Sequence, residues 1–361
     1  MKEMNAPHIR RKQNAPQLYL DVVIALLPCC VAAIYAYGLR ALVLLLWGAM
    51  LHTLTDHLFS RFVRREQAYP DLSGLISGLI LVLLLPPTVS IWAVSAGVLF
   101  SSIVVKQFFG GVGSNLFNPA LAGRAFLAVA FAKTTTVLAE PLSSRWALFT
   151  LMAGPASAVS ATPGNPDWLE ILTGLFPGAM GLTGALFAAA GGVYLLLRGI
   201  IKLHAPLSYM ITLTVGYWLF FFGEASVIGM LRMLTSTGVI FCATFALSDF
   251  STVPISSPGR IAFGIGTGIT ALILFSSGRP DLAVVFPVLA MNGVTPVFEF
   301  YIRPRIFAQH PWYSRKADAE QANTDQEVPI MGQTDESLAI QGQTDESLAL
   351  QGQTDESEAR T

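Results

Sequence analysis

Long apolar stretches separated by short polar loops are the feature that most limits how this chain can fold. Hydrophobic residues make up 53 % of the 361 residues and charged residues only 12 %, whereas soluble domains carry about 25 % charged residues. A soluble fold with so few charges would leave too much apolar surface in water. The composition therefore predicts an all-α integral membrane protein, whose helices satisfy their own backbone polar groups in lipid.

The apolar stretches predict about ten transmembrane helices, because a helix needs about 20 mostly apolar residues to cross the hydrocarbon core. They are expected at Leu18–Gly38, Arg40–Phe59, Leu72–Leu85, Ile91–Phe108, Asn118–Phe131, Gly178–Leu197, Pro206–Phe222, Val227–Leu247, Arg260–Phe275 and Leu282–Ile302. The third and the fifth are short. Short or broken helices are typical of the central sites of transporter-like folds.

Lys and Arg residues predict the orientation, because they gather in cytoplasmic loops. Clusters occur at Arg10–Lys12, Arg61–Arg65, Arg198–Lys202 and Arg303–Arg305, all on one side of the expected helices. Both termini are therefore expected in the cytoplasm, and the segment 132–177 outside. The N-terminal arm, residues 1–17, is polar and basic and does not resemble a secretory signal peptide.

The expected membrane domain, residues 18–307, has two weakly similar halves, about 18–131 and 178–302, joined by the external loop 132–177. FNPALAGRAF at Phe117–Phe126 is similar to FPVLAMNGVTPVF at Phe286–Phe298, each in the last helix of its half. Two five-helix units would enter the membrane from opposite faces, which predicts an inverted repeat with broken or re-entrant helices.

The C-terminal segment 308–361 has a different composition. GQTDES recurs there every ten residues, from Gly332, Gly342 and Gly352. With almost no apolar content, it is expected to be a disordered acidic tail without a part in the chemistry.

Charge and cysteine content exclude several functions. The formal net charge is −1, so no basic field is available to hold nucleic acid. Cys29, Cys30 and Cys242 lie in apolar runs and lack the spacing of a zinc or disulfide framework. They are expected to be small apolar helix residues, and we expect no metal site, since an iron–sulfur cluster held by this chain alone would need four thiolates.

Small and polar residues inside the apolar stretches predict local contacts. Gly74 and Gly78, like Gly264 and Gly268, have the four-residue spacing that lets helices approach closely. His52 and Asp56 share one face of a helix, and a carboxylate in the membrane centre costs roughly 2.5–3.5 kcal/mol. Asp56 therefore has a partner or lies near the membrane interface, and the nearby Arg61 favours the interface. Asp249 and Arg260 are expected to form a solvated pair at the ends of a cytoplasmic loop.

The densest motif is FGGVGSNLFNPALAGRAFL at Phe109–Leu127. Its glycines permit positive φ angles and a close backbone approach. Asn118 followed by Pro119 predicts a helix N-cap with proline in the first helical position. The motif predicts a broken or re-entrant segment whose free N–H groups face a flavin, a small anion or only a structural break, and the residues by themselves favour none of the three.

Two cations flank this motif. Lys106 and Arg124 are candidates to neutralise negative charge on a flavin, although an arginine near a helix end can also extend to the interface. The candidate cofactor-binding residues in and around the motif are Lys106, Gly110, Gly111, Gly113, Asn115, Asn118 and Arg124.

The motif resembles the signature of the family that contains the D subunit of the Rnf electron-transport complex and the B subunit of the sodium-pumping NADH:quinone reductase. Similar stretches are DLSGLISGLILVLLLPP from Asp71, LTGLFPGAMGLTGALFAAAGGVYLL from Leu172 and SSPGRIAFGIGTGITALIL from Ser256. The similarity covers roughly residues 16–307. The short N-terminal arm favours the Rnf branch, with a component of the quinone-reductase type as the alternative. Leu182 stands where the family has a glutamate.

The resemblance implies a flavoprotein. Family members hold FMN through a phosphoester to a threonine, which requires a flavin transferase, and related complexes hold a second flavin, riboflavin or FMN, within the helices. The matching run here is S-A-T-P at Ser160–Pro163, so Thr162 would carry the FMN and Ser160 would lie beside it. This run belongs to the loop that the charges place outside.

The resemblance also implies a function, that of a non-autonomous membrane subunit of an ion-translocating oxidoreductase complex in the bacterial inner membrane. Other membrane and peripheral subunits would supply the ferredoxin or NAD(H) chemistry, since this chain has no dinucleotide-binding motif. The complex would move Na+ or H+ outward, and the sequence does not choose between them. A cofactor-free channel or transporter for a small solute is the alternative from another class, because an inverted repeat suits it equally.

Overall fold

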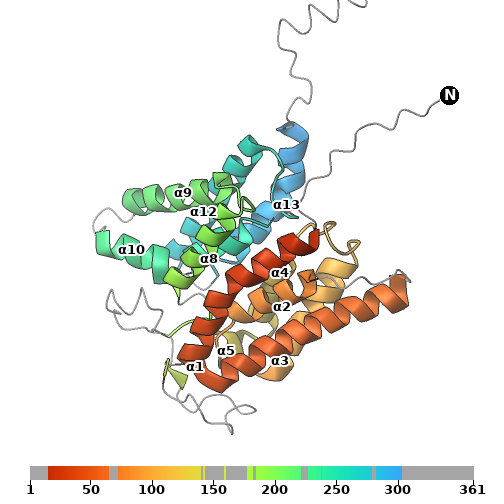
Figure 1. Ribbon diagram of the computed structural model, residues 1–361. Coiled ribbons are helices and arrows are strands. Elements are labelled where there is room, and N and C mark those ends of the chain that lie inside the picture. Colours follow the sequence, from red (N-terminus) through yellow and green to blue (C-terminus); the bar gives the residue numbers. More distant parts are fainter. Residues whose placement is uncertain are drawn as a thin grey trace, which may run out of the picture. The chain divides into compact units, whose positions relative to one another are not determined.

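The computed structural model describes residues 15–64, 72–139, 141–142, 158–159, 177–181, 184–220, 227–236, 238–249, 251–278 and 282–302. These residues are mostly helical, which confirms the predicted fold class at that level (Figure 1). Most of the N-terminal arm, Ser160, Thr162, Leu182 and the acidic tail lie outside the described residues.

The first half of the described chain consists of helices of unequal length. They are α1 (Ala15–Phe59), the π-helix η1 (Ser60–Arg64), α2 (Ser73–Leu83), α3 (Ile91–Leu99), the π-helix η2 (Phe100–Gln107), α4 (Pro119–Ala130) and α5 (Ala132–Thr135). Two short antiparallel strands, β1 (Leu138–Ala139) and β2 (Ala158–Val159), follow.

The second half of the described chain also consists of helices of unequal length. It contains α8 (Ala185–Leu197), α9 (His204–Phe220), α10 (Val227–Ser236), α11 (Val239–Phe241), the π-helix η3 (Cys242–Ala246), α12 (Ser257–Ser276) and α13 (Phe286–Tyr301). Contacts between α1 and α8 and between α4 and α13 join the two halves.

The longest helix, α1, is broken at Gly38. This residue has φ 65° and ψ −145°, a conformation outside the helical region that glycine adopts without steric penalty. The break divides α1 into two helical arms, which Figure 1 shows as a red arm and an orange arm that meet at a sharp bend. The arms correspond to the first two expected spans, which the sequence separates at the same glycine.

The helices α2 and α4 lie in the two expected spans that the sequence showed to be short, and each is too short by itself to cross a bilayer. They have 11 and 12 residues, which at about 1.5 Å per residue is roughly half of the ~30 Å hydrocarbon thickness. The last carbonyls of α2 are satisfied from elsewhere in the chain. Leu83 accepts from the Gly181 N–H (2.7 Å), Leu84 from Arg124 Nε (3.0 Å) and Leu85 from the Met180 N–H (3.0 Å).

The predicted close packing at glycines is confirmed. A Cβ atom on Gly78 would lie 2.5 Å from the Gly48 carbonyl oxygen, so α2 contacts the backbone of α1 directly. On α12, a Cβ atom on Gly264 would overlap the Ala205 carbonyl oxygen of α9. Because neither position has room for a side chain, glycine sets the distance between these helix pairs.

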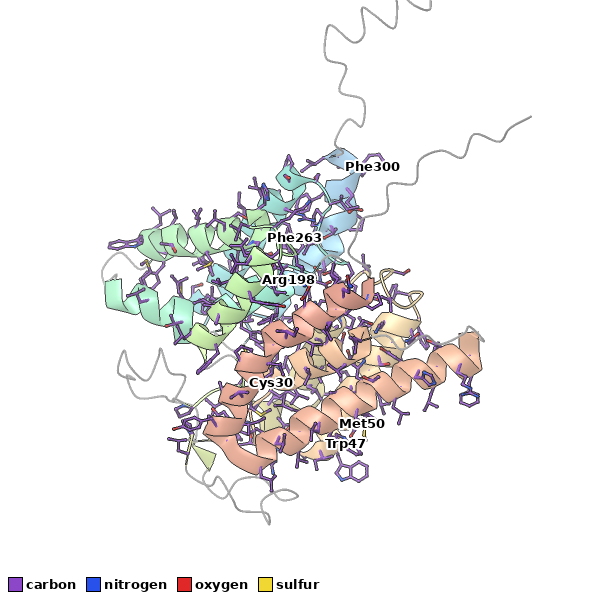
Figure 2. The ribbon with its side chains drawn as sticks, in the orientation of Figure 1. Cys30, Trp47, Met50, Arg198, Phe263 and Phe300 are labelled. Carbon is purple, nitrogen blue, oxygen red and sulfur yellow. The ribbon has the colours of Figure 1, made fainter. Side chains whose placement is uncertain are left out.

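Apolar side chains cover the outer faces of the helices. Figure 2 draws these side chains around the ribbon and labels Met50 on α1. Met50 is 57 % exposed, and Leu197 is 82 % exposed. Soluble proteins seldom expose so much contiguous apolar surface, whereas lipid covers it without cost. The arrangement is that of a membrane protein.

Length and composition identify two described helices that can cross a membrane, Pro16–Val63 and Ser257–Ser276. A pair bent by 48°, Gly229–Thr235 with Val239–Ala246, is a third if it forms one broken span. Each of the ten expected stretches contains helix. Ten crossings and an inverted repeat nevertheless stay predictions, since most of these helices are shorter than a full span.

Candidate functional site

A cavity lies where the glycine-rich segment meets residues from both halves of the chain. Its wall is formed by Tyr19 and Val22 of α1, Ser73, Ile76, Ser77 and Ile80 of α2, Lys106 of η2, Val112, Gly113, Asn115, Asn118, Pro119 and Ala120, and from the second half Leu195, Ile200, Ile201, Thr244, Phe245, Ser248, Asp249 and Ser251. One set of these side chains is apolar and the other carries hydroxyl, amide and charged groups. A ligand that combines apolar surface with polar groups fits such a lining.

The glycine-rich segment has the backbone conformation that the sequence predicted. Gly110, Gly111 and Gly113 have φ angles of 116°, 87° and 82°, which only glycine adopts readily. A Cβ atom on Gly113 would have no other atom within 4 Å. The segment is therefore open at Gly113, which lines the cavity.

Asn115, which lines this cavity, has a buried acceptor atom. Its side chain is 9 % exposed, and its Oδ1 atom has no hydrogen-bond partner among the described residues. A buried amide oxygen without a partner costs about 1–3 kcal/mol. An N–H donor on a ligand in the cavity would remove this cost.

Asn118 caps α4 and connects it to the second half. Its Oδ1 atom accepts from the N–H groups of Ala120 (3.1 Å) and Leu121 (3.3 Å), and Pro119 occupies the first turn, as predicted. Its Nδ2 atom donates to Asp249 Oδ2 (3.0 Å). With the Asn292 amide oriented to satisfy its neighbours, the Asn118 backbone N–H donates to Asn292 Oδ1 on α13 (3.1 Å).

The expected solvated pair of Asp249 and Arg260 is wrong. Asp249 accepts from Asn118, from the backbone N–H and hydroxyl of Ser251 (3.1 and 2.9 Å) and from Thr252 Oγ1 (3.2 Å). Arg260 Nε instead donates to the Pro254 carbonyl (2.7 Å). Burial raises the pKa of the Asp249 carboxyl, although the hydrogen bonds from Ser251, Thr252 and Asn118 act in the opposite direction.

The sequence favoured a position of Asp56 near the membrane interface over an ion-pair partner, and the structure shows that Asp56 has such a partner. Lys106 Nζ lies 2.5 Å from Asp56 Oδ2 and also donates to Ser73 Oγ (2.6 Å). Ser102 Oγ (2.6 Å) and Gln107 Nε2 (3.0 Å) donate to Asp56 Oδ1. The sequence made Lys106 a candidate to neutralise charge on a flavin. The structure shows that its ammonium group is paired with Asp56 and that Lys106 lines the cavity.

The π-helix η2 makes this arrangement feasible. Hydrogen bonds from i to i+5 widen the turn, so that residues four and five positions apart point to the same side. Ser102, Lys106 and Gln107 all reach the same carboxylate for this reason. In a regular α-helix, residues five apart do not share a face.

The candidate residues fall into three groups. Lys106, Gly113, Asn115 and Asn118 line the cavity. Gly110 and Gly111 shape the preceding turn, and Arg124 is 5 % exposed and donates to the end of α2, outside the cavity lining. Thr162 and Ser160 lie outside the described residues.

The sequence interpretation missed the contribution of the second half to the wall. Thr244 lies in η3 and Ser248 lies just after it, and both line the cavity together with Asp249. The available signal was the four-residue spacing of two hydroxyl side chains in an apolar segment. That signal is weak, because hydroxyl groups in apolar helices often bond only to their own backbone.

Comparisons with known proteins identify the family of the chain. The model of the NQR2, RnfD, RnfE family matches residues 3–308. The D subunit of the Na(+)-translocating ferredoxin:NAD(+) oxidoreductase complex of Acetobacterium woodii is 32 % identical over 320 residues, which cover 85 % of this chain and 96 % of that protein.

Two further relatives carry similar names. The D subunit of the proton-translocating ferredoxin:NAD(+) oxidoreductase complex of Clostridium ljungdahlii is 27 % identical over 83 % of this chain and 94 % of its own length. The D subunit of the ion-translocating oxidoreductase complex of Halorhodospira halophila is 29 % identical over 91 % of this chain and its whole length. From the extent of these matches and the helical architecture, the chain is a membrane protein that belongs to the NQR2, RnfD, RnfE family.

Proposed function

We propose that this chain is the D subunit of an Rnf-type complex that couples electron transfer between ferredoxin and NAD(H) to ion movement across the bacterial inner membrane. The observation that carries the proposal is the family match over residues 3–308, together with relatives named as D subunits over nearly their whole length. One relative is named for Na+ and another for protons, so the name of a relative does not select the ion.

The experiment uses inverted membrane vesicles that contain the whole complex. Reduced ferredoxin and NAD+ should drive uptake of Na+ or H+ into these vesicles, and deletion of this chain should abolish both uptake and NAD+ reduction. Complementation with the full chain is the control. Normal ion uptake in the deletion strain would overturn the proposal, and solute transport by the chain alone would favour the channel or transporter alternative.

We also propose that Thr162 carries FMN by a phosphoester. Family membership and the single S-A-T-P run in the sequence support this assignment. The group would supply one-electron chemistry when bound. Thr162→Val keeps the side-chain shape and should abolish the adduct, and Thr162→Ser should retain part of it, because the hydroxyl oxygen is the attachment atom.

The matched control is Ser160→Ala, which removes a hydroxyl from the same run and should leave the adduct in place. Peptide mass spectrometry after coexpression with a flavin transferase measures the modification. Finding only unmodified Thr162 peptide, while a partner flavoprotein in the same preparation is fully labelled, would refute the covalent attachment.

A second flavin, riboflavin or FMN, is proposed for the cavity. Ile76, Ile80 and Phe245 supply apolar surface for a ring, and Asn115 and Lys106 supply an acceptor and a donor at its edge. Denaturing the purified chain should release about one non-covalent flavin per chain, and Asn115→Ala should lower this amount. Release of no flavin from the wild-type protein would overturn this part of the proposal.

A further inference from the structure

The carboxylate of Asp56 occupies a space next to α2 that exists because residue 74 is a glycine. Gly74 on α2 has no side chain, and a Cβ atom there would lie 2.7 Å from Asp56 Oδ2. Three donors from η2, on Ser102, Lys106 and Gln107, converge on the two carboxylate oxygens. The carboxylate is only 14 % exposed. This is a built site for a negative charge, formed by α1, α2 and η2 together.

The partner of this carboxylate is almost completely buried. Lys106 is 2 % exposed, and its ammonium group lies between Asp56 and Ser73 at the wall of the cavity. An ammonium group at this depth is stable only with a counter-charge and hydrogen-bond acceptors. Asp56 supplies the charge and Ser73 supplies a second acceptor.

A histidine supports the same carboxylate from the adjacent turn of α1. His52 is completely buried, with Nδ1 3.4 Å from Asp56 Oδ2 and Nε2 3.2 Å from Ser101 Oγ. Ser101 in turn donates to the Pro119 carbonyl of α4 (2.7 Å). The contacts therefore run from the cavity wall at Lys106, through Asp56, to the first turn of α4, which also lines the cavity.

From this geometry we propose that Asp56 is a positioning residue for the cavity: it holds the Lys106 ammonium group at the wall and sets the net charge that a ligand meets there. The inference rests on the proposed flavin in the cavity. With Asp56 in place the Lys106 charge is balanced, so a ring that gains an electron next to it gains only moderate electrostatic stabilisation. Removal of either charge would change the affinity of the ring for that electron.

The test is a redox titration of the non-covalent flavin in the purified full chain, followed by its visible absorbance. Asp56→Asn leaves the Lys106 charge unbalanced and should shift the midpoint potential of this flavin to a more positive value. Lys106→Gln leaves the Asp56 charge unbalanced and should shift it to a more negative value. The double variant should return close to the wild-type potential, since both charges are absent.

Three further variants separate positioning from a merely structural role. Asp56→Glu keeps the charge and should restore much of the wild-type potential. Gly74→Ala adds no charge but places a Cβ atom against the carboxylate, and should shift the potential in the same direction as Asp56→Asn. Ser102→Ala removes one hydrogen bond and no charge, and should lower the thermal midpoint with little change in potential.

The outcomes distinguish this inference from the function on which it rests. Flavin that stays bound with the wild-type potential in both Asp56→Asn and Lys106→Gln would overturn the inference and leave the cavity flavin intact. Release of no non-covalent flavin from the wild-type chain would overturn the cavity flavin and this inference with it. If Asp56→Asn does not accumulate in the membrane, Lys106→Gln and Gly74→Ala provide the same contrast.

Discussion

The side chain of Asn118 donates a hydrogen bond to the carboxylate of Asp249 across 131 positions of the sequence, at 3.0 Å. One end of the Asn118 amide caps α4, and the other end connects this helix to the loop before α12. The Asn118 side chain therefore fixes the start of α4 and also forms a hydrogen bond between the two halves at the cavity wall.

Replacement of Asn118 should separate these two roles. Asn118→Ala removes the cap, which contributes about 1 kcal/mol, and a hydrogen bond to a charged group, which contributes about 1.5–3 kcal/mol. Asn118→Ser keeps an oxygen that can cap α4 but is too short to reach Asp249. Thermal midpoints in detergent should fall in the order wild type, Ser, Ala, and equal midpoints for the wild type and Asn118→Ser would mean that the link to Asp249 contributes nothing.

Gly78→Ala should destabilise the protein although alanine favours a helix. The new Cβ atom would lie 2.5 Å from the Gly48 carbonyl oxygen, so α1 and α2 must separate. Gly293→Ala on α13 is the matched control, because its Cβ atom would meet nothing closer than 3.7 Å. There the gain in helix propensity, about 0.5–1 kcal/mol, should appear as a higher thermal midpoint. Opposite signs are expected, and a loss of stability of similar size in both variants would contradict the close contact.

Asp249 should make stability depend on pH. Burial raises its pKa in the folded state above the ordinary value of 3.8, so the folded chain binds a proton more tightly than the unfolded chain does. The contribution of this group to stability is therefore largest at low pH and falls as the pH rises from about the ordinary value through the raised pKa. The difference in thermal midpoint between the wild type and Asp249→Asn should follow this course.

Ser251→Ala provides the internal check for this pH dependence. The Ser251 hydroxyl donates to the carboxylate and lowers its pKa, so its removal should move the decline to a higher pH. A wild-type curve parallel to that of Asp249→Asn at every pH would show that the carboxyl group is not perturbed.

The predicted membrane topology can be tested with reporter fusions. Reporter fusions at Gln309 and near Asn165 should give cytoplasmic and external signals respectively, because the basic clusters lie on one side of the expected helices. A fusion after Lys202 is the control for the cytoplasmic side. The prediction requires an odd number of crossings between Asn165 and Gln309. The same signal at both positions would therefore disprove it.

Local patterns predicted the elements of the cavity that depend on neighbouring residues. The Asn118–Pro119 pair predicted the start of α4, and the glycines before it predicted backbone with positive φ, because both effects act within a few residues. The four-residue spacing of Gly74 and Gly78 likewise predicted a close helix contact, which the structure places between α2 and α1.

Contacts between residues distant in sequence could not be predicted from such local patterns. Lys106 lies 50 positions from Asp56, and no local rule pairs two residues at that separation. The π-helical turn that brings Ser102 and Gln107 to the same carboxylate has no composition of its own. For Asp249, the sequence indicated the nearby Arg260, and tertiary packing selected Asn118 instead.

The end of α2 has a consequence for how the chain is made. The buried carbonyls of Leu83 and Leu85 receive their donors from Gly181 and Met180, which are synthesised about a hundred residues later. Until then these acceptors must stay in contact with water or with the insertion machinery, because a buried carbonyl without a donor costs about 1–3 kcal/mol. The first half therefore enters the membrane with one helix end unfinished, and release of a stable protein has to wait for the second half.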